Sequence, residues 1–332
     1  MVKIGIIGAS GAVGLEMLKV MAEKNIQIAE LRLFASEKTA GKKITYLNEE
    51  ITIELVKEDS FKGLDFVLGA TSNELAIRYA PLIKASNAIF IDNSSAFRMN
   101  EDVPLVVAEI NGEDVFKNQG IIANPNCSTI ISMIAINSLN KLSKIKGIYA
   151  ATYQAVSGAG LAGIKELKEE IEALNNNEKF QVKTFDKQIA YNCLPKIGSK
   201  EANLYTSEEM KMQNEGRKIL HLPDLLVSCT CVRVPVLRSH AISLNVILED
   251  ELDLDLIRGQ IAKAKGVKLV DNIDHAIYPN PLEASNQDLV MVGRIRKDLV
   301  NPKGINLFCV GDQIRKGAAT NAVQIMELLM NK

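Results

Sequence analysis

The run from Asn124 to Thr129 places a cysteine at the start of a stretch with helical periodicity. Two asparagines and a proline predict a turn there, and Asn126 is a residue type that commonly caps a helix N-terminus. A thiol at that end of a helix lies in the positive field of the helix dipole, which favours the thiolate over the thiol. Cys127 is therefore our candidate nucleophile. We expect the remaining cysteines to be small buried hydrophobic residues: Cys193, Cys229, Cys231 and Cys309.

Three histidines are available as the proton partner that a cysteine nucleophile requires. His221 stands where a helix is expected to end, His275 stands in a loop, and His240 opens an alternating strand. Arg233 lies seven positions before His240, a spacing that would direct the two side chains to opposite faces of an unbroken strand. Pro235 stands between them and predicts an interruption of that strand.

A glycine-rich turn stands between a short apolar strand, Lys3 to Ile7, and a helix. Strand, glycine turn and helix are typical of the opening of a dinucleotide-binding fold, where bare backbone approaches a pyrophosphate at a helix N-terminus. A tight turn without a ligand is the alternative. The candidate cofactor-binding residues are Gly8, Ser10, Gly11, Ala12, Val13 and Gly14. The helix is expected to bury one side composed of Leu15, Leu18, Met21 and Ala22.

The end of the second strand is where an NAD-binding protein places an acidic residue on the ribose hydroxyls. This chain has Ser36, Glu37, Lys38 and Thr39 there. Hydroxyls and a lysine suit the additional phosphate of NADP, so we expect NADP(H) to contact Ser36, Lys38 and Thr39. Glu37 is negatively charged and does not suit a phosphate site. For Lys38, the alternative to a phosphate contact is an ordinary solvated charge of the loop.

Two further polar loops follow apolar strands in the first half of the chain. Thr71 lies in the first loop, where it could border the cofactor, whereas Ser72 or Asn73 beside it could instead cap a helix. Arg98 ends the second loop, which begins at Asp92. An arginine in such a loop is a candidate anion ligand, and an ordinary salt bridge is the competing interpretation.

Alternating apolar strands and helices predict a doubly wound first domain. Its further elements are expected at Ala29–Ala35, Ile51–Val56, Asp65–Gly69, Ala88–Ile91 and Leu105–Val107 as strands, and at Asn73–Ala85 as a helix. From Lys146 onward longer strands predict a second, mixed sheet. Its strands are expected at Ile148–Val156, Val227–Val234, Ile242–Leu248, Leu289–Ile295 and Ile305–Val310, and its helices at Leu161–Leu174, at Ser207–Leu220 with Ser207 as cap, and at Leu252–Lys263. A last helix after Gly311 is expected to pack on the first domain.

The composition of the 332 residues, 47% hydrophobic and 24% charged, suits two globular domains. The 39 basic and 40 acidic residues give a net charge of -1, so we expect no nucleic-acid partner. There is no signal-peptide pattern and no apolar run of about 18 residues, so we expect no membrane partner. Five cysteines without a Cys-x-x-Cys spacing argue against disulfides and against a structural metal site, and favour a cytoplasmic location.

Seven ordered motifs, spread over essentially the full length, resemble those of the aspartate-semialdehyde dehydrogenase family. They are Gly8–Gly14, Asp92–Arg98, Asn124–Thr129, Gln154–Gly160, Glu208–Lys211, Arg233 with Ser239-His240, and Arg315–Ala319. The resemblance implies an NADP-dependent oxidoreductase that acts on an aldehyde group, and a homodimer or homotetramer whose contacts come mainly from the second domain. It also implies a place in the biosynthesis of lysine, threonine, methionine and, in bacteria, diaminopimelate.

The resemblance implies that the chain converts L-aspartyl 4-phosphate to L-aspartate 4-semialdehyde with NADPH. Cys127 would expel inorganic phosphate and hold a thioester, and His240 would supply the proton as the thiohemiacetal breaks down. Gln154 would orient the substrate near the sulfur. The implied substrate-binding residues are Arg98, Asn126 and Lys211 for the phosphate, Glu208 for the amino group and Arg233 for the carboxylate. On the cofactor side the resemblance adds Ser157, Gly158 and Gln313.

The expected fold is therefore α/β with an α+β second domain. A Rossmann-type NADP-binding domain is expected at residues 1–126, completed by residues 312–332 with the C-terminal helix, and a mixed-sheet catalytic and dimerisation domain at 127–311. The chain departs from the family pattern at Gln313, where asparagine is expected, and at Ala108, where proline is usual. The departure at Gln313 affects a residue that is expected to contact the cofactor.

Two alternatives compete with this interpretation. N-acetyl-gamma-glutamyl-phosphate reductase shares the chemistry but binds an acylated nitrogen, and Glu208 favours a free ammonium group instead. A surface ion pair with Lys211 is a structural alternative for Glu208. The second competitor is a non-catalytic dinucleotide-binding relative, against which the presence of both Cys127 and His240 argues.

Overall fold

The computed structural model describes residues 1–330, and within this range the chain divides into two compact units. The first unit consists of residues 1–126 and the segment from Ala318 onward, and the second consists of residues 127–317. Residues 312–317 thus lie in the second unit, and not with the first as we expected. Asp312 holds them there, because its carboxylate accepts hydrogen bonds from the backbone of Ile314 and Arg315 and from the side chain of Arg238.

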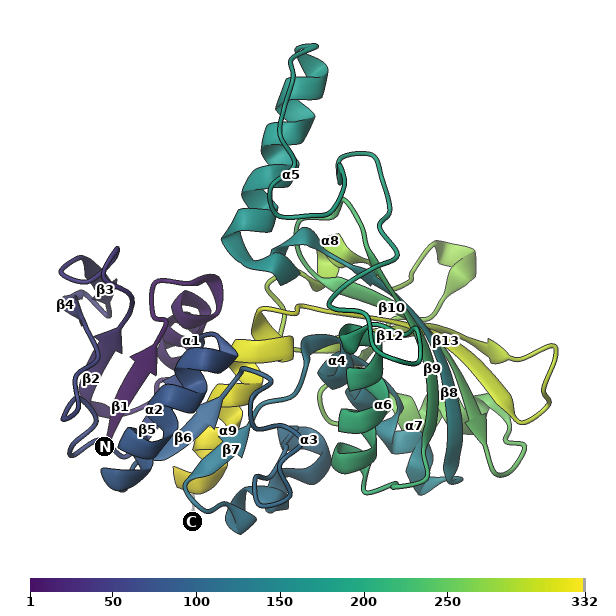
Figure 1. The fold of residues 1–332 in the computed structure, drawn as a ribbon. Coiled ribbons are helices and arrows are strands. Elements are labelled where there is room, and N and C mark those ends of the chain that lie inside the picture. Colours follow the sequence, from purple (N-terminus) through teal and green to yellow (C-terminus); the bar gives the residue numbers. More distant parts are fainter. Residues whose placement is uncertain (331–332) are drawn as a thin grey trace. The chain divides into compact units, whose positions relative to one another are not determined.

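The described strands of the first unit form one seven-stranded sheet in the order β3-β4-β2-β1-β5-β6-β7. Neighbouring strands are parallel except in the β3–β4 pair (Figure 1). The strand order reverses at β1 and β5, and in such sheets ligands bind where the carboxyl ends meet this reversal. The strands are β1 (Val2–Ile7), β2 (Ile28–Phe34), β3 (Lys43–Tyr46), β4 (Glu49–Glu54), β5 (Phe66–Gly69), β6 (Ile89–Asp92) and β7 (Ile121–Ala123).

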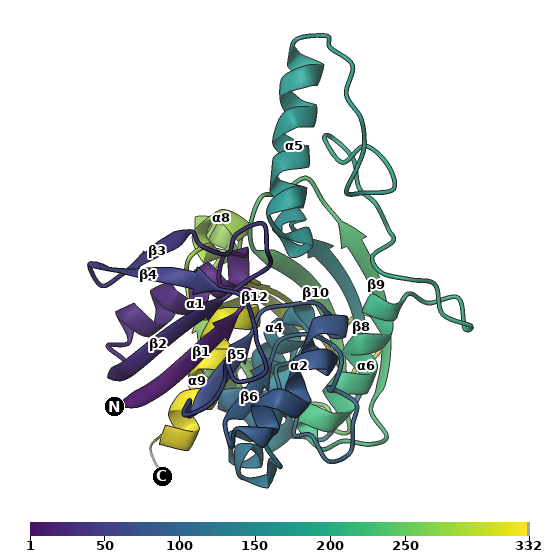
Figure 2. The same ribbon diagram turned by 60° about the vertical axis from the view of Figure 1, so that its left-hand side comes forward.

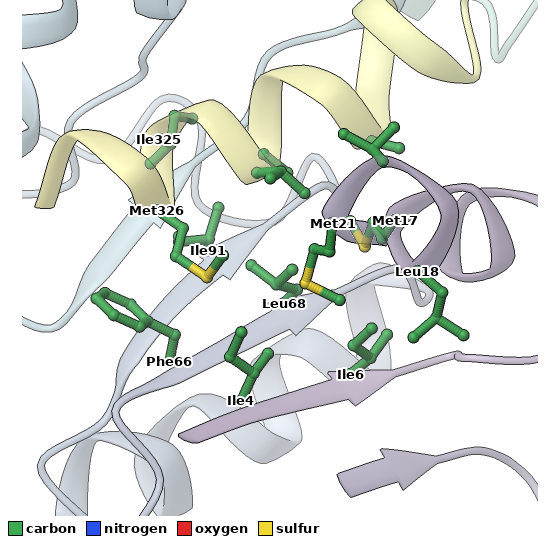
Figure 3. Packing of buried hydrophobic residues seen from close by; sticks show 14 of the residues in the cluster. Ile4, Ile6, Met17, Leu18, Met21, Phe66, Leu68, Ile91, Ile325 and Met326 are labelled. Atoms are coloured by element: carbon green, nitrogen blue, oxygen red, sulfur yellow. The ribbon is translucent and has the colours of Figure 1, made fainter. Parts of the chain in front are cut away.

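Helices cover both faces of this sheet, which explains why its central strands are nearly continuous apolar runs. Helices α1 (Ala12–Glu23) and α9 (Thr320–Met330) pack on one face, where Met21 and Met326 meet Ile4 and Leu68 (Figure 3). Helix α2 (Asn73–Ala85) packs on the other. The last helix therefore returns to the first unit, as predicted.

The second unit is built on a six-stranded mixed sheet in the order β11-β12-β13-β10-β8-β9. Strand β10 is antiparallel to β8 and β13, whereas β8 and β9 are parallel. Helices α4 (Cys127–Ile136) and α6 (Ser207–Leu220) lie on one face of the sheet. The strands are β8 (Ile145–Gln154), β9 (Leu226–Arg233), β10 (His240–Leu248), β11 (Val267–Leu269), β12 (Val290–Lys297) and β13 (Gly304–Gly311).

Helix α5 (Gly160–Asn175) and the segment that returns from it to α6 form an arm that extends away from this sheet (Figures 1 and 2). The arm has its own small apolar cluster, in which Leu167 of α5 packs with Ile189, Ala190 and Leu194 of the returning segment. On α5, Lys165 and Glu169 form an ion pair at 3.5 Å. The returning segment is thus packed against the helix that precedes it.

The remaining elements are short. They are α3 (Ala108–Asn111), α7 (Leu254–Ala262), α8 (Pro281–Ala284), the 3-10 helices η1 (Gly112–Lys117), η2 (Asn137–Lys141), η3 (Val156–Ala159) and η4 (Ile273–His275), and the π-helix η5 (Arg315–Ala319). Within residues 1–330, none of the helices has the length and apolar character that crossing a membrane requires.

The expected α/β fold with a mixed-sheet second unit is confirmed, but several local predictions were wrong. Residues 105–107 form no strand, although Leu105 makes a single bridge to Ala123 of β7. The cap of α6 is Thr206 and not Ser207. On α1, Leu15 is 43% exposed, whereas Met17 and Val20 are buried. Helix α2 agrees with prediction, including its cap, since the backbone N–H of Leu75 donates to the Ser72 hydroxyl.

Candidate active site

Cys127 is the first residue of α4, as the sequence predicted. Its side chain is partly exposed, whereas every other residue of the helix is buried. A glycine faces it from a distant part of the chain, because a Cβ at position 317 would lie 2.8 Å from the Cβ of Cys127. Gly317 therefore leaves the space that the cysteine occupies. Gly317 belongs to the Arg315–Ala319 motif, but its sequence position alone predicted no role for it.

Three polar side chains meet at one edge of the six-stranded sheet. Gln154 ends β8, Arg233 ends β9 on one side of it, and His240 begins β10 on the other. Because β8 and β9 are parallel and β10 runs in the opposite direction, the last residues of β8 and β9 and the first residue of β10 lie at the same end of the three strands. The spacing of Arg233 and His240 is thereby explained, since the two residues belong to different strands with β8 between them.

His240 is fully buried, and the backbone N–H of Ala155 donates a hydrogen bond to its Nδ1 at 3.0 Å. Nδ1 is therefore an acceptor, and the proton of the neutral ring is on Nε2. Burial lowers the pKa of His240 to about 3, with a further lowering by the charge of Arg233 and an opposing effect of Glu208. Nε2 of His240 lies 3.5 Å from Nε2 of Gln154. Since both nitrogens bear hydrogen, this is a contact between donors, and His240 retains its Nε2 proton for another acceptor.

The guanidinium of Arg233 is 7% exposed and is held by its surroundings. Nη1 donates a hydrogen bond to the carbonyl oxygen of Ala155 at 2.7 Å. A Cβ at position 158 would lie 2.6 Å from this nitrogen, so the approach requires Gly158. Burial lowers the pKa of Arg233, and the negative charges of Cys127 and Glu208 oppose that effect. An arginine remains protonated at neutral pH even so, and Arg233 supplies a fixed positive charge.

Helix α6 presents a carboxylate to this edge of the sheet. A capping box between Thr206 and Glu209 fixes the start of the helix. Glu208 is 9% exposed, and its two oxygens accept hydrogen bonds from Nε2 of Gln154 at 3.1 Å and from Nζ of Lys211 at 2.9 Å. The predicted helical pair of Glu208 and Lys211 is therefore formed, and it is joined to Gln154.

Gln313 links two loops beside His240. Its Oε1 accepts a hydrogen bond from the backbone N–H of Ser239 at 2.8 Å, and its Nε2 donates to the hydroxyl of Ser157. Ser239 has a φ of 73°, a conformation that is costly for a residue with a side chain. Both polar groups of the Gln313 amide are thus engaged within the second unit, and its contact with the cofactor stays a prediction.

The glycine turn of the first unit fits the pyrophosphate of a dinucleotide. Gly8 has a φ of 80°, and a Cβ there would lie 2.1 Å from the carbonyl oxygen of Ala70, at the end of β5. A Cβ at position 14 would lie 2.4 Å from the carbonyl oxygen of Gly8. Gly11 is the N-cap of α1 and, as a glycine, leaves the first amides of the helix to an external anion. Bare backbone at a helix start is the cradle that such a group requires.

The hydroxyl of Ser10 lies 3.3 Å from Oγ1 of Thr39, so the loop after β2 borders the glycine turn. Ser36 and Lys38 in that loop are exposed and therefore accessible to a phosphate from the solvent. Thr71 follows β5, at the edge of the sheet where β1 ends. The cofactor-binding residues that were predicted in the first unit therefore gather at the carboxyl ends of β1, β2 and β5.

Arg98 is buried and fixed by the backbone of the first unit. Its Nε donates to the carbonyl oxygen of Asn124 at 3.0 Å, and its Nη2 donates to that of Asn93 at 2.7 Å. The neighbouring Asp92 has a raised pKa, because burial outweighs hydrogen bonds from Ser94 and the charge of Arg98. Arg98 and Asn126 belong to this unit, whereas the other predicted substrate-binding residues belong to the second.

The cysteine predictions were correct for Cys229, Cys231 and Cys309, which are buried, and wrong for Cys193, which is exposed in the segment that returns from α5. Burial raises the pKa of the Cys309 thiol. Among residues 1–330, no group of three or more histidine, cysteine or acidic side chains is placed to hold a metal ion.

Comparison with known families agrees with this geometry. The family model "Semialdehyde dehydrogenase, NAD binding domain" matches residues 3–118, and "Semialdehyde dehydrogenase, dimerisation domain" matches residues 136–316. The first unit is thus a nicotinamide-dinucleotide-binding domain, and the second is a domain through which semialdehyde dehydrogenases associate. Together the two matches define the class of protein as a semialdehyde dehydrogenase.

Individual relatives narrow this class. The chain is 45% identical to an aspartate-semialdehyde dehydrogenase of Synechocystis sp. over 100% of this chain and 98% of the relative, and 45% identical to one of Aquifex aeolicus over 99% and 98%. A crystal structure of aspartate semialdehyde dehydrogenase II from Vibrio cholerae, complexed with ASA, superposes with a TM-score of 0.97 at 40% identity, over 100% of this chain and 99% of that chain. The chain belongs to the aspartate-semialdehyde dehydrogenase family.

Proposed function

We propose that this chain is an NADP-dependent aspartate-semialdehyde dehydrogenase, which reduces L-aspartyl 4-phosphate to L-aspartate 4-semialdehyde and releases inorganic phosphate. The observation that supports this most is the grouping of Arg233, Glu208 and His240 around Gln154. A cation and a carboxylate at one sheet edge complement the carboxylate and the ammonium of an amino acid. The proton on Nε2 of His240 lies beside them. The family places this activity in the biosynthesis of lysine, threonine and methionine.

The proposed chemistry starts at the thiolate of Cys127. It attacks the acyl carbon, a C–S bond forms, and the bond from that carbon to the phosphate oxygen breaks, which leaves a thioester. When bound, the nicotinamide cofactor supplies the hydride that reduces this thioester. The resulting thiohemiacetal oxygen accepts a hydrogen bond from Nε2 of His240, and the C–S bond then breaks. Arg98, Asn126 and Lys211 bind the phosphate in this proposal, and Gln154 orients the acyl group.

NADP(H) and phosphate are supported by the charges at their proposed sites. Lys38 and the hydroxyls of Ser36 and Thr39 lie at the carboxyl end of β2, where a ribose phosphate would be bound. Ser157 and Gly158 lie beside His240 and would face the nicotinamide. These assignments are supported by the positions of Ser36, Lys38 and Thr39 after β2, and of Ser157 and Gly158 in η3.

A homodimer through the second unit is the proposed assembly. Successive side chains on β8 and β9 point to opposite faces of the sheet. On the face away from α4 and α6, Tyr149, Tyr153 and Leu226 are 62, 41 and 64% exposed. A monomeric sheet face of this kind would ordinarily be polar. A second copy of the chain is the partner that the dimerisation-domain match favours. A tetramer of such dimers is the further possibility within the family.

A side-by-side assay distinguishes this function from its alternatives. Aspartate semialdehyde and N-acetylglutamate semialdehyde are offered with NADP or NAD, with and without phosphate. We expect phosphate-dependent formation of NADPH from aspartate semialdehyde, and a Glu208→Gln variant with a raised KM for it and unchanged NADP binding. Preference for the acetylated substrate would identify the reductase instead, and binding of NADP without turnover of either would identify a non-catalytic relative.

A further inference from the structure

The segment that returns from α5 contacts Arg233 through both its backbone and a side chain. Leu194 and Arg233 exchange two backbone hydrogen bonds, of 2.9 and 2.8 Å, in an antiparallel bridge. Nine residues earlier in the same segment, the ring of Phe185 lies over the guanidinium, with 5.9 Å between its centroid and Cζ of Arg233. The arm therefore meets the residue proposed for the substrate carboxylate at two points.

Two carboxylates of α5 hold this segment in place. Glu166 accepts hydrogen bonds from three successive backbone amides, those of Lys183, Thr184 and Phe185. Glu170 accepts from the next turn of the segment, at Ile189 and Ala190. Burial raises the pKa of Glu166, but these hydrogen bonds outweigh burial and the net effect is a lowered pKa. The backbone that bears Phe185 is thus tied to the helix directly before the ring.

The ring of Phe185 is also confined on its far side. Its Cζ lies 3.1 Å from the position that a Cβ would take at Gly163 of α5, so the ring packs over bare backbone of the helix. Phe185 and Arg233 together line a cavity of about 290 Å³, with Gly198 near the start of α6 among the other lining residues. One edge of the guanidinium is bound by Ala155, and one of its faces is covered by the ring.

The geometry points to Phe185 as a positioning residue for Arg233, and to the α5 arm as the element that sets specificity for a substrate with an α-carboxylate. An aromatic face attracts a guanidinium and restricts its rotation, while the remaining N–H groups stay in the plane where a carboxylate binds. This inference rests on the proposed function, since it presumes that Arg233 binds the carboxylate.

The test compares Phe185→Leu with Phe180→Leu. Phe180 is a partly buried aromatic residue on the same returning segment and serves as the matched control. We expect Phe185→Leu to raise the KM for aspartate semialdehyde about tenfold, because leucine keeps the apolar contact and loses the aromatic face. We expect kcat to change by no more than about twofold, and Phe180→Leu to leave both constants unchanged.

A second substrate separates positioning from a general loss of structure. 3-Aminopropanal keeps the ammonium and aldehyde groups of aspartate semialdehyde and lacks the carboxylate, so its KM should be the same for Phe185→Leu and wild type. A rise in KM for both substrates, or a Phe185→Leu variant that behaves as Phe180→Leu does, would overturn the inference. Failure of the wild-type chain to turn over aspartate semialdehyde would instead overturn the proposed function.

Discussion

Ala155 donates its backbone N–H to Nδ1 of His240, and its carbonyl oxygen accepts a hydrogen bond from Arg233. One peptide segment at the end of β8 thus fixes both the ring and the guanidinium. For His240 the consequence is a neutral ring with its proton on Nε2, since a second proton would have to displace the Ala155 hydrogen bond. His240 is therefore neutral throughout the neutral pH range, and in the proposed mechanism it donates a hydrogen bond to the substrate through Nε2.

This arrangement predicts a specific pH dependence of stability. The pKa of His240 falls from 6.5 in the unfolded chain to about 3 in the folded protein, so between these values the unfolded state binds the additional proton. The unfolding free energy should therefore decrease as the pH falls below 6.5, by about 2 kcal/mol at pH 5 from this residue alone. The measurement is urea unfolding at pH 8 and pH 5 of the wild type and His240→Asn. The unfolding free energy of the wild type relative to that of His240→Asn should be about 2 kcal/mol lower at pH 5 than at pH 8. A difference that does not change with pH would refute the lowered pKa of His240.

Gly317 provides a test of the space around the nucleophile. Gly317→Ala places a methyl group 2.8 Å from the Cβ of Cys127, which must displace either the cysteine or the turn after β13. We expect kcat to fall at least about tenfold, and overpacking to cost about 1–3 kcal/mol of stability.

Gly259 offers the matched control, because a Cβ there meets open space on α7. Gly259→Ala should leave kcat unchanged and stabilise the protein by about 0.5–1 kcal/mol, the difference in helix propensity. Equal kcat values for the two alanine variants would show that Gly317 does not constrain Cys127.

The exposed apolar face of the second unit, which bears Tyr149, Tyr153 and Leu226, predicts that two copies of the chain associate through it. Tyr149→Asp places a charge at the centre of that face, where it would be buried and unpaired in a dimer. Light scattering during size-exclusion chromatography should give the mass of two chains for the wild type and of one chain for the variant. Leu282→Asp is the control, since Leu282 is 88% exposed on α8. A Tyr149→Asp variant that remains dimeric would place the interface elsewhere.

The order of the strands explains what the sequence could and could not predict. Most strands and helices follow from local periodicity, and the candidate site residues could be proposed from motifs. The separation of Arg233 and His240 by β8, however, depends on pairing between β8 and β9 across more than 70 positions, which no local pattern specifies. Residues 105–107 are apolar and buried like those of a strand, yet only Val106 donates a backbone hydrogen bond to β7, at Ala123, whereas the carbonyl oxygen of Val107 accepts hydrogen bonds from the backbone of α3.

Individual contacts that no sequence pattern specifies account for the residues that were missed. Thr206 and Ser207 are both capping residue types, and only the reciprocal bond with Glu209 selects the first. Phe185 shows no periodic signal in its loop, and its position over Arg233 depends on Glu166 of α5. The exposure of Cys193 likewise follows from the path of the returning segment, since the neighbouring Leu194 takes the buried position.

The central claim is that Cys127 is the group that forms the acyl-enzyme. The most direct measurement is phosphate-dependent NADPH formation from aspartate semialdehyde by Cys127→Ala, together with NADP binding by the same variant. We expect turnover to fall to background and NADP affinity to be retained, because the predicted cofactor turn lies at the start of α1 and Cys127 lies on α4. Substantial phosphate-dependent turnover by Cys127→Ala would contradict it.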